Sequence, residues 1–359
     1  MHRPHPELSL DELVTSEWQR LVSVEVERDG MATLYSRPWA DEVVRERVQF
    51  EPWVLTQRDE VVEGLTPVRV EEHSGDGVLD RRVRFQTMND CREAVRTLKR
   101  ETGINPTAAD APYRVFNDEQ QQVLTLLPAR LFRGMEFEEL VRLQLDIETE
   151  TAPGFDFPNA ERQEDRIIII ALRDSTGWEC CLSVVEMSEA QMLEAMVEEV
   201  RKRDPDVIEG HNLFGFDLPY ISERARRHGV RLRLGRGGRL LQSRPSRFTA
   251  GERTSSYTRF SAYGRHIVDT LHLVQLYDVS TRDLESYSLK SVAVHFGVAA
   301  ADRTYLDVEG IGEAFAQDPE RVKAYSMDDV RETDAISRIL SPGYFYHAQI
   351  VPFSYQNCT

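Results

Sequence analysis

The sequence lacks a long hydrophobic run, because no stretch approaches the roughly 20 apolar residues that a membrane-spanning helix needs. The N-terminal residues MHRPHPELSLDEL also lack the features of a secretory signal peptide. These absences predict a protein with no membrane-spanning segment.

Cysteine is scarce, with four residues in the whole chain: Cys91, Cys180, Cys181 and Cys358. Their spacing matches no metal-binding pattern, and two adjacent cysteines are poor disulfide partners. The sequence therefore predicts a reducing location, the cytoplasm. Internal repeats and low-complexity tracts are absent too. The 359 residues, 41% of them hydrophobic and 29% charged, are typical of a globular protein with two domains.

Positive charge is concentrated in one segment of a chain whose net charge is −17. Twelve arginines, no lysine and a single acid, Glu252, lie between Arg224 and Arg265, so this segment carries +11 and the rest of the chain −28. A basic segment on an acidic body predicts binding of a polyanion. A solvated, partly disordered loop is the alternative. Aromatic residues that can stack on unpaired bases lie among the arginines: Phe248, Tyr257, Phe260 and Tyr263.

The order of expected elements predicts two domains of different class. Residues 1–138 read as a smaller, mainly β domain, with a helix ending at Gly103 and a helical connector that begins at about residue 109. Residues 139–359 read as three strands, a helix, a strand and then helices, with a basic insertion at about 230–263. Ser188 and Gln191 form a capping box at the start of the first of these helices. This pattern predicts an α/β domain with a mixed sheet flanked by helices.

Two carboxylates lie at the end of the apolar strand LQLDIETE, residues 143–150. Side chains alternate along a strand, so Asp146 and Glu148 share one face while Leu145 and its apolar neighbours face the core. Like charges on one face repel each other unless a cation lies between them. A solvated strand end and a divalent metal site both remain open, because the chain holds further Asp-x-Glu pairs, among them Asp283/Glu285 and Asp307/Glu309.

Two later segments carry acids at positions that suit the same site. Asp217 follows the buried strand DVIEGH at the N-terminus of a helix, where it is either a helix cap or a ligand. Tyr325 and Asp329 are four residues apart in a helix and therefore share a face. Each alone is explained by structure as readily as by function.

Taken in order, LDIET, GHNLFGFDLPYI and YSMDDVRETDAI resemble the three exonuclease motifs of B-family DNA polymerases. That family belongs to the DEDD superfamily of 3′–5′ exonucleases, which has a ribonuclease H-like fold. YGRHIVDTLHLV and YSLKSVAVHFG are similar to the family's sequence between the second and third motifs. The resemblance covers about residues 109–355, and residues 1–108 are more weakly similar to the family's N-terminal domain. Tyr325, four residues before Asp329 and preceded by alanine, fits the tyrosine subclass, DEDDy.

The resemblance implies removal of nucleoside 5′-monophosphates from the 3′ end of single-stranded or frayed DNA, as in proofreading. The four acids would bind two divalent cations, Mg²⁺ or Mn²⁺: Asp146, Glu148, Asp217 and Asp329. Tyr325 would orient the attacking water, because a phenol with a pKa of about 10 is a poor base. Asn212 and Phe216 would contact the substrate strand, and arginines would hold its phosphates: Arg231, Arg233, Arg247, Arg253 and Arg259.

Polymerase signatures such as Tyr-Gly-Asp-Thr-Asp are absent, although the tail SPGYFYHAQIVPFSYQNCT resembles the lead into the polymerase region. A fragment of a larger polymerase and a free-standing exonuclease are both open, and the aromatic-rich tail favours the fragment. The expected partners are a DNA 3′ end and a polymerase domain in cis or in trans. Two other functions remain open: a catalytically silent DNA-binding or docking module, and an RNA-directed exonuclease of the same fold.

Overall fold

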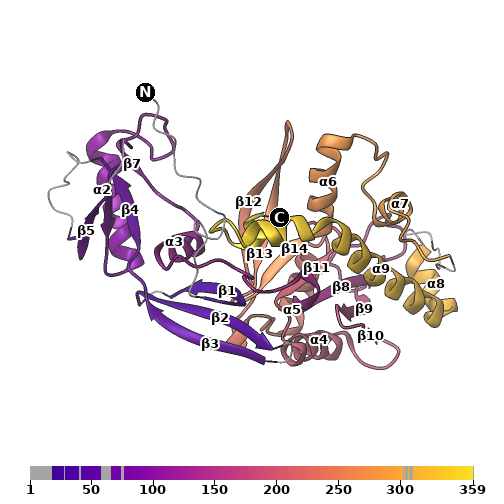
Figure 1. Cartoon of the computed structure of the whole chain (residues 1–359). Helices are drawn as coiled ribbons and strands as arrows, with labels where there is room; N and C mark the ends of the chain where they lie inside the picture. Colours follow the sequence, from indigo (N-terminus) through magenta and orange to yellow (C-terminus); the bar gives the residue numbers. More distant parts are fainter. Residues whose placement is uncertain are drawn as a thin grey trace. The chain divides into compact units, whose positions relative to one another are not determined.

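The computed structural model describes residues 18–27, 29–39, 42–57, 66–73, 77–301, 303, 306 and 310–358. They form two compact units (Figure 1). The first comprises the described residues up to Gly134 together with His347–Cys358, and the second is Met135–Tyr346. The domain division inferred from the sequence, 1–138 and 139–359, stays a prediction. Asp307 and Glu309 lie outside the described residues.

The first unit contains two antiparallel sheets. One has the order β1-β2-β3: β1 (Leu21–Val26), β2 (Met31–Trp39) and β3 (Glu42–Gln49). The other has the order β5-β6-β4-β7: β5 (Arg69–Glu72), β6 (Arg81–Arg84), β4 (Trp53–Thr56) and β7 (Tyr113–Arg114). Its helices are α2 (Met88–Thr102), α3 (Glu119–Leu126) and α11 (Tyr355–Cys358). Gly103 ends α2 with a φ of 69°, a backbone conformation that glycine adopts without strain. The predicted mainly-β N-terminal region is confirmed.

The second unit is built on a five-stranded mixed sheet with the order β10-β9-β8-β11-β14. Its strands are β8 (Arg142–Thr149), β9 (Ile167–Asp174), β10 (Glu179–Ser183), β11 (Val207–Gly210) and β14 (His266–Asp269). Strand β9 is antiparallel to both β8 and β10, whereas β11 runs parallel to both β8 and β14. The predicted mixed sheet is confirmed.

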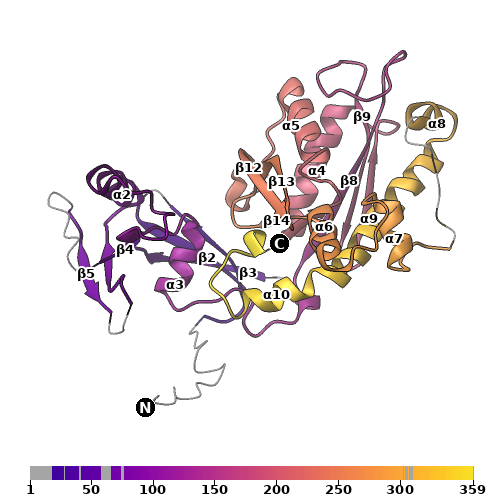
Figure 2. The same cartoon turned by 90° about the horizontal axis from the view of Figure 1, so that it is seen from above.

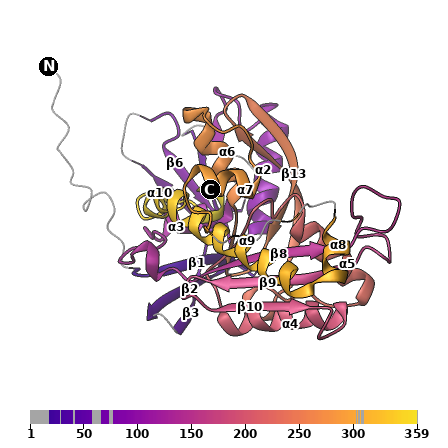
Figure 3. The same cartoon turned by 90° about the vertical axis from the view of Figure 1, so that its right-hand side faces the viewer.

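Helices cover both faces of this sheet (Figures 2 and 3). On one face lie α4 (Glu189–Arg203), which begins with the predicted capping box, and α5 (Asp217–His228). The opposite face is covered by the long helix α9 (Pro319–Leu340) and by α8 (Ile311–Gln317). The remaining helices are α6 (Thr270–Thr281), α7 (Leu289–His295) and α10 (Pro342–Ala348). Among the described residues, none of the helices has the length and apolar character needed to cross a membrane.

Strand β8 separates an apolar face from a polar one. Leu143, Leu145 and Ile147 are at most 4% exposed and pack in the core with residues of α4 and α5. Each such side chain contributes about 1.5–3 kcal/mol to folding. The alternate side chains face α9, where Arg142 forms a buried ion pair with Asp334 at 2.8 Å. The alternation predicted from the sequence is therefore confirmed, and it directs Asp146 and Glu148 toward α9.

The basic segment forms a two-stranded hairpin of β12 (Gln242–Ala250) and β13 (Arg253–Ser261), not a structureless loop. Three of the twelve arginines in the segment are buried in ion pairs outside this hairpin. Arg224 pairs with Glu189, Arg236 with Asp206 and Arg265 with Asp204, at distances of 2.6 to 2.7 Å. These three arginines stabilise the fold, so the charge available to a polyanion is smaller than the sequence predicts.

Candidate active site

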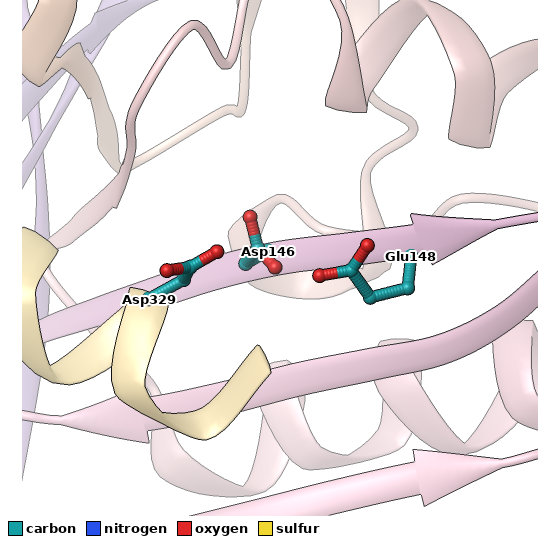
Figure 4. A group of neighbouring side chains, drawn as sticks. All are labelled: Asp146, Glu148 and Asp329. Atoms are coloured by element: carbon teal, nitrogen blue, oxygen red, sulfur yellow. The ribbon is translucent and has the colours of Figure 1, made fainter. Parts of the chain in front are cut away.

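Strand β8 and helix α9 bring three of the predicted acids together (Figure 4). One carboxylate oxygen each from Asp146, Glu148 and Asp329 lies within 4.8 Å of the others. Ser326, on the same helix as Asp329, donates a hydrogen bond from Oγ to Asp146 Oδ2 at 3.2 Å. Residues separated by about half the chain thus form one acidic cluster.

Asp217 lies beside this cluster, because its Oδ1 accepts a hydrogen bond from the backbone N–H of Ile147 at 3.2 Å. Ile147 is the residue between Asp146 and Glu148. Strand β8 extends beyond its pairing with β11, which ends at Gln144, so this N–H has no strand partner on that side. Asp217 is the first residue of α5, and Phe216 occupies the N-cap position. The carboxylate of Asp217 is therefore held at β8, so all four predicted acids lie at the same part of this strand.

The acids share an unfavourable electrostatic environment. Burial, together with the charges of Glu148, Asp329 and Asp217, raises the pKa of Asp146 well above its ordinary value. Burial and the neighbouring acids raise the pKa of Glu148 well above its ordinary value too, and burial does the same for Asp217. The pKa of Asp329 is raised mainly by burial, against the opposing effect of Arg303. Four carboxylates that are hard to ionise together form a donor set suited to a hard divalent cation.

Two basic residues that the sequence analysis did not single out lie at the edge of the cluster. Arg303 forms an ion pair with Asp329 at 2.7 Å. Lys290 places its Nζ 4.6 Å from the centre of the Tyr325 ring, and its charge lowers the pKa values of Glu148 and Asp329. Lys290 falls within the segment YSLKSVAVHFG that carried the resemblance, whereas no spacing or motif marks Arg303.

Tyr325 is 4% exposed, and its ring lies near both cations, with Lys290 Nζ 4.6 Å and Arg303 Cζ 5.8 Å from the ring centre. Burial, followed by the charge of Asp329, raises the pKa of its phenol above the ordinary value of 10. The hydroxyl therefore stays protonated at neutral pH. It can donate a hydrogen bond but is unsuited to act as a base.

Asn212 and Phe216 lie in the turn that joins β11 to α5, directly before Asp217. Asn212 is exposed and has a φ of 67°, and its carbonyl accepts hydrogen bonds from the N–H groups of Gly215 and Phe216. Phe216 is half-buried and lines a groove of about 820 Å³ with residues 155–162 and the start of α5. Phe216 thus directly precedes Asp217, and Asn212 is connected to Phe216 through its backbone carbonyl.

The five arginines predicted to contact the substrate all lie at or near the hairpin. Arg231, Arg233, Arg247 and Arg253 are exposed and Arg259 is half-buried. Within the part of the chain that the structure describes, none of the five forms an ion pair, so their charges are available to a ligand.

The aromatic residues of the hairpin differ from expectation, because they pack against the protein itself. Phe248 stacks on His272 with ring centres 3.9 Å apart, and Tyr257 contacts the same histidine edge-on. Phe260 is 4% exposed. These rings support the hairpin. Phe260 is buried and therefore unavailable to a base, whereas base stacking by the half-buried Phe248, Tyr257 and Tyr263 stays a prediction.

Comparison with known proteins connects the site to a family. Residues 120–292 match the family model described as DNA polymerase family B, exonuclease domain. The chain is 32% identical to a DNA polymerase of Pyrococcus glycovorans, over 57% of this chain and 25% of that protein. It is 33% identical to DNA polymerase 2 of Aeropyrum pernix, over 50% of this chain and 21% of that protein. The chain thus spans about a quarter of the length of these relatives.

A solved structure shares the fold. The family B DNA polymerase from the archaeon Pyrobaculum calidifontis superimposes with a TM-score of 0.69, over 94% of this chain and 47% of that one, at 21% sequence identity. The family match ends before α9, which contributes Tyr325 and Asp329 to the site. The sequence match and the shared fold agree: residues 120–292 of the chain are similar to the exonuclease domain of DNA polymerase family B.

Proposed function

We propose that the protein is a metal-dependent 3′–5′ exonuclease that removes nucleoside 5′-monophosphates from the 3′ end of single-stranded or frayed DNA. The observation that carries this proposal is the convergence of Asp146, Glu148 and Asp329 within 4.8 Å of one another, with Asp217 bonded to the backbone between the first two. A fold without chemistry gains nothing from like charges crowded at a strand end.

The donor set fits two hard divalent cations, Mg²⁺ or Mn²⁺. Asp146 would bridge them, Glu148 and Asp329 would complete one site, and Asp217 would support the other directly or through water. When bound, such ions lower the pKa of a water and neutralise charge on the phosphate and the leaving oxygen.

The residues around the acids have separate tasks in this proposal. Tyr325, whose hydroxyl stays protonated, donates a hydrogen bond that orients the attacking water. Lys290 offsets the negative charge of Glu148. Asn212 and Phe216 hold the last nucleotide at the groove next to α5. The exposed arginines bind phosphates without reading sequence, which suits a substrate defined by its end and not by its bases. The exonuclease would act together with a polymerase domain in cis or in trans.

The direct test compares single-stranded DNA with RNA of the same sequence, labelled at either end, in Mg²⁺ and in EDTA. We expect stepwise shortening from the 3′ end of DNA in Mg²⁺, release of 5′-mononucleotides, and no reaction in EDTA. Asp146→Asn should lower the rate by at least about 10³-fold, because one substitution removes the ligand shared by both cations.

Asp283→Asn is the matched control. Asp283 belongs to a second Asp-x-Glu pair, is exposed and lies outside the acidic cluster, so its substitution should leave the rate unchanged. Preferential cleavage of RNA would assign the RNA-directed reading. Binding of DNA without cleavage by the wild type in Mg²⁺ and Mn²⁺ would overturn the exonuclease proposal in favour of a silent binding module.

A further inference from the structure

The turn between β11 and α5 has a constrained backbone. Asn212 has a φ of 67°, in the left-handed region that non-glycine residues seldom adopt. Gly215 lies so close to it that an added Cβ would be 2.2 Å from the Asn212 side-chain oxygen. Two bonds within the turn, from the N–H groups of Gly215 and Phe216 to the carbonyl of Asn212, close it, and further bonds reach it from outside.

Those bonds come from one buried carboxylate, that of Asp269 at the end of β14. Its Oδ1 accepts from the N–H of Asn212 at 2.8 Å, and its Oδ2 accepts from the N–H of Phe214 at 2.9 Å. Oδ1 also accepts from the N–H of Leu271 at 3.0 Å, which caps α6. Asp269 is 3% exposed, so these charge-assisted bonds form away from water, where they are strongest.

The neighbouring residue adds a second connection. The hydroxyl of Thr270 bonds to Nδ1 of His211 at 2.9 Å, and the Nε2–H of His211 donates to the carbonyl of Tyr287 at 2.7 Å. Burial lowers the pKa of His211, which is consistent with a neutral ring that accepts at Nδ1 and donates at Nε2. Tyr287 directly precedes the N-cap of α7, the helix that carries Lys290. The β14–α6 junction is thus connected to both sides of the acidic cluster.

From this arrangement we propose that Asp269 is a positioning residue for the exonuclease site. It would act through the turn Asn212–Phe216, fixing the two predicted substrate contacts and the start of α5, where Asp217 is bonded to Ile147 on the other side. The inference rests on the proposed function for its effect on rate, but its effect on the turn stands independently. A role limited to capping α6 is the competing explanation.

Two substitutions separate the roles. Asp269→Ser keeps an oxygen that can cap α6 through Leu271 but is too short to reach the turn. Asp269→Asn replaces one accepting oxygen with an NH₂ group that faces an N–H donor. The matched control is Asp174→Asn. Asp174 is another buried aspartate, 2% exposed, that accepts from the N–H groups of Thr176 and Trp178 in the β9–β10 turn, away from the acids.

The experiment measures three properties of the full-length chain: hydrogen exchange of the backbone amides of residues 211–217, Mn²⁺ affinity by calorimetry, and single-turnover cleavage of an oligothymidylate. For both Asp269 variants we expect at least about tenfold faster exchange at the amides of Asn212 and Phe214. Mn²⁺ affinity should fall about tenfold, since mutation of outer partners of metal ligands typically costs 10–100-fold. Cleavage at saturating DNA should slow by about 10²-fold, the effect of a displacement of about 1 Å.

Asp174→Asn should leave all three readouts at wild-type values, whatever its effect on the melting temperature. Unchanged exchange at Asn212 and Phe214 in Asp269→Ser would overturn the proposal and leave Asp269 as a helix cap. If the wild type does not cleave DNA at all, the proposed function fails, and the exchange and Mn²⁺ measurements still decide whether Asp269 positions the turn.

Discussion

At the scale of single residues, the acidic cluster carries a cost that the metal-free protein must bear. Asp146, Glu148 and Asp217 all have raised pKa values, so ionising them in the folded state is harder than in the unfolded chain. The folded state then binds more protons than the unfolded state as soon as the pH exceeds the ordinary aspartate value of 3.8. The contribution of these groups to stability therefore falls as the pH rises toward their folded-state pKa values.

This sign gives a prediction for metal-free protein. In EDTA, Asp146→Asn should raise the free energy of unfolding at pH 8 by about 1–2 kcal/mol, because each pKa unit corresponds to about 1.4 kcal/mol. The gain should be smaller at pH 5, because protonation of the wild-type acids relieves the repulsion as the pH falls. Urea denaturation at the two pH values measures it, with Asp283→Asn as the control. A variant less stable than wild type at pH 8 would contradict the repulsion described here.

Tyr325 gives a second prediction at this scale. Its raised pKa keeps the hydroxyl protonated, so Tyr325→Phe removes a hydrogen-bond donor and no titrating base. We expect the cleavage rate at saturating DNA to fall by about 10²-fold, the typical effect of losing one well-placed donor. The shape of the pH–rate profile should not change. Loss of a basic or acidic limb of that profile in the variant would instead assign a proton-transfer role to the phenol.

At the scale of elements, the arginines of the hairpin of β12 and β13 and of its flanking segments fall into two groups, buried and exposed. Arg236 and Arg265 are buried in ion pairs, whereas Arg247 and Arg253 are exposed and form no ion pair within the described residues. The two groups carry the same charge and differ in burial: a buried arginine stabilises the fold through an ion pair, whereas an exposed arginine is available to bind a ligand.

This division predicts opposite outcomes for the two groups. Replacing the five exposed or half-buried arginines with glutamine should weaken binding of oligothymidylate and reduce the salt slope by up to about 0.7 for each phosphate that is no longer neutralised. The five positions are Arg231, Arg233, Arg247, Arg253 and Arg259. Arg236→Gln should instead destabilise the fold by about 3–5 kcal/mol, because it removes the guanidinium that forms an ion pair with the buried carboxylate of Asp206. Fluorescence anisotropy across a salt series and urea denaturation distinguish them, and an unchanged slope would remove the arginines from DNA binding.

Elements defined by local chemistry were predictable from neighbouring residues and the meeting of the four acids from the resemblance, whereas tertiary contacts outside those motifs were not. The alternation along β8, the capping box at Ser188 and the end of α2 at Gly103 follow from neighbouring residues alone, and the structure confirms each of them. Arg303 and Asp269 were not predictable, because their importance arises from groups distant in sequence that folding brings near.

The hairpin was not predictable for a different reason. Its strands are rich in arginine, serine and threonine, a composition that resembles a solvated loop. The side chains that stabilise it belong to other elements. His272, which stacks on Phe248, is in α6. The composition correctly predicted the exposed, basic surface of this segment, but it did not predict the contacts with His272 that stabilise the hairpin.

At the scale of the whole molecule, the acids, Tyr325, the turn before α5 and the hairpin all belong to the second unit, Met135–Tyr346. The matched family model begins earlier, at residue 120, and the relatives extend over about four times the aligned length. The candidate site is therefore contained in one compact unit of this chain, whereas the matched relatives are longer than the chain.

This containment predicts where a divalent cation stabilises the chain. Mg²⁺ at about 100 times its dissociation constant should stabilise the unit that binds it by about 2.7 kcal/mol. Hydrogen exchange of the full chain should slow within residues 135–346, most strongly at β8 and α9, and stay unchanged in β1–β3. Asp329→Asn should abolish the effect, whereas protection spread evenly over the chain would contradict a single binding region.

The two faces of β8 have a consequence for how this protein can vary. Because consecutive side chains point in opposite directions, inserting or deleting a single residue between Arg142 and Asp146 would exchange the environments of everything beyond it. The leucines would then face solvent and α9, and the carboxylates would face the hydrophobic core. Insertions and deletions in this strand are tolerable only in steps of two residues. During evolution, the number of residues in β8 is therefore more tightly constrained than the identity of any one of its apolar side chains.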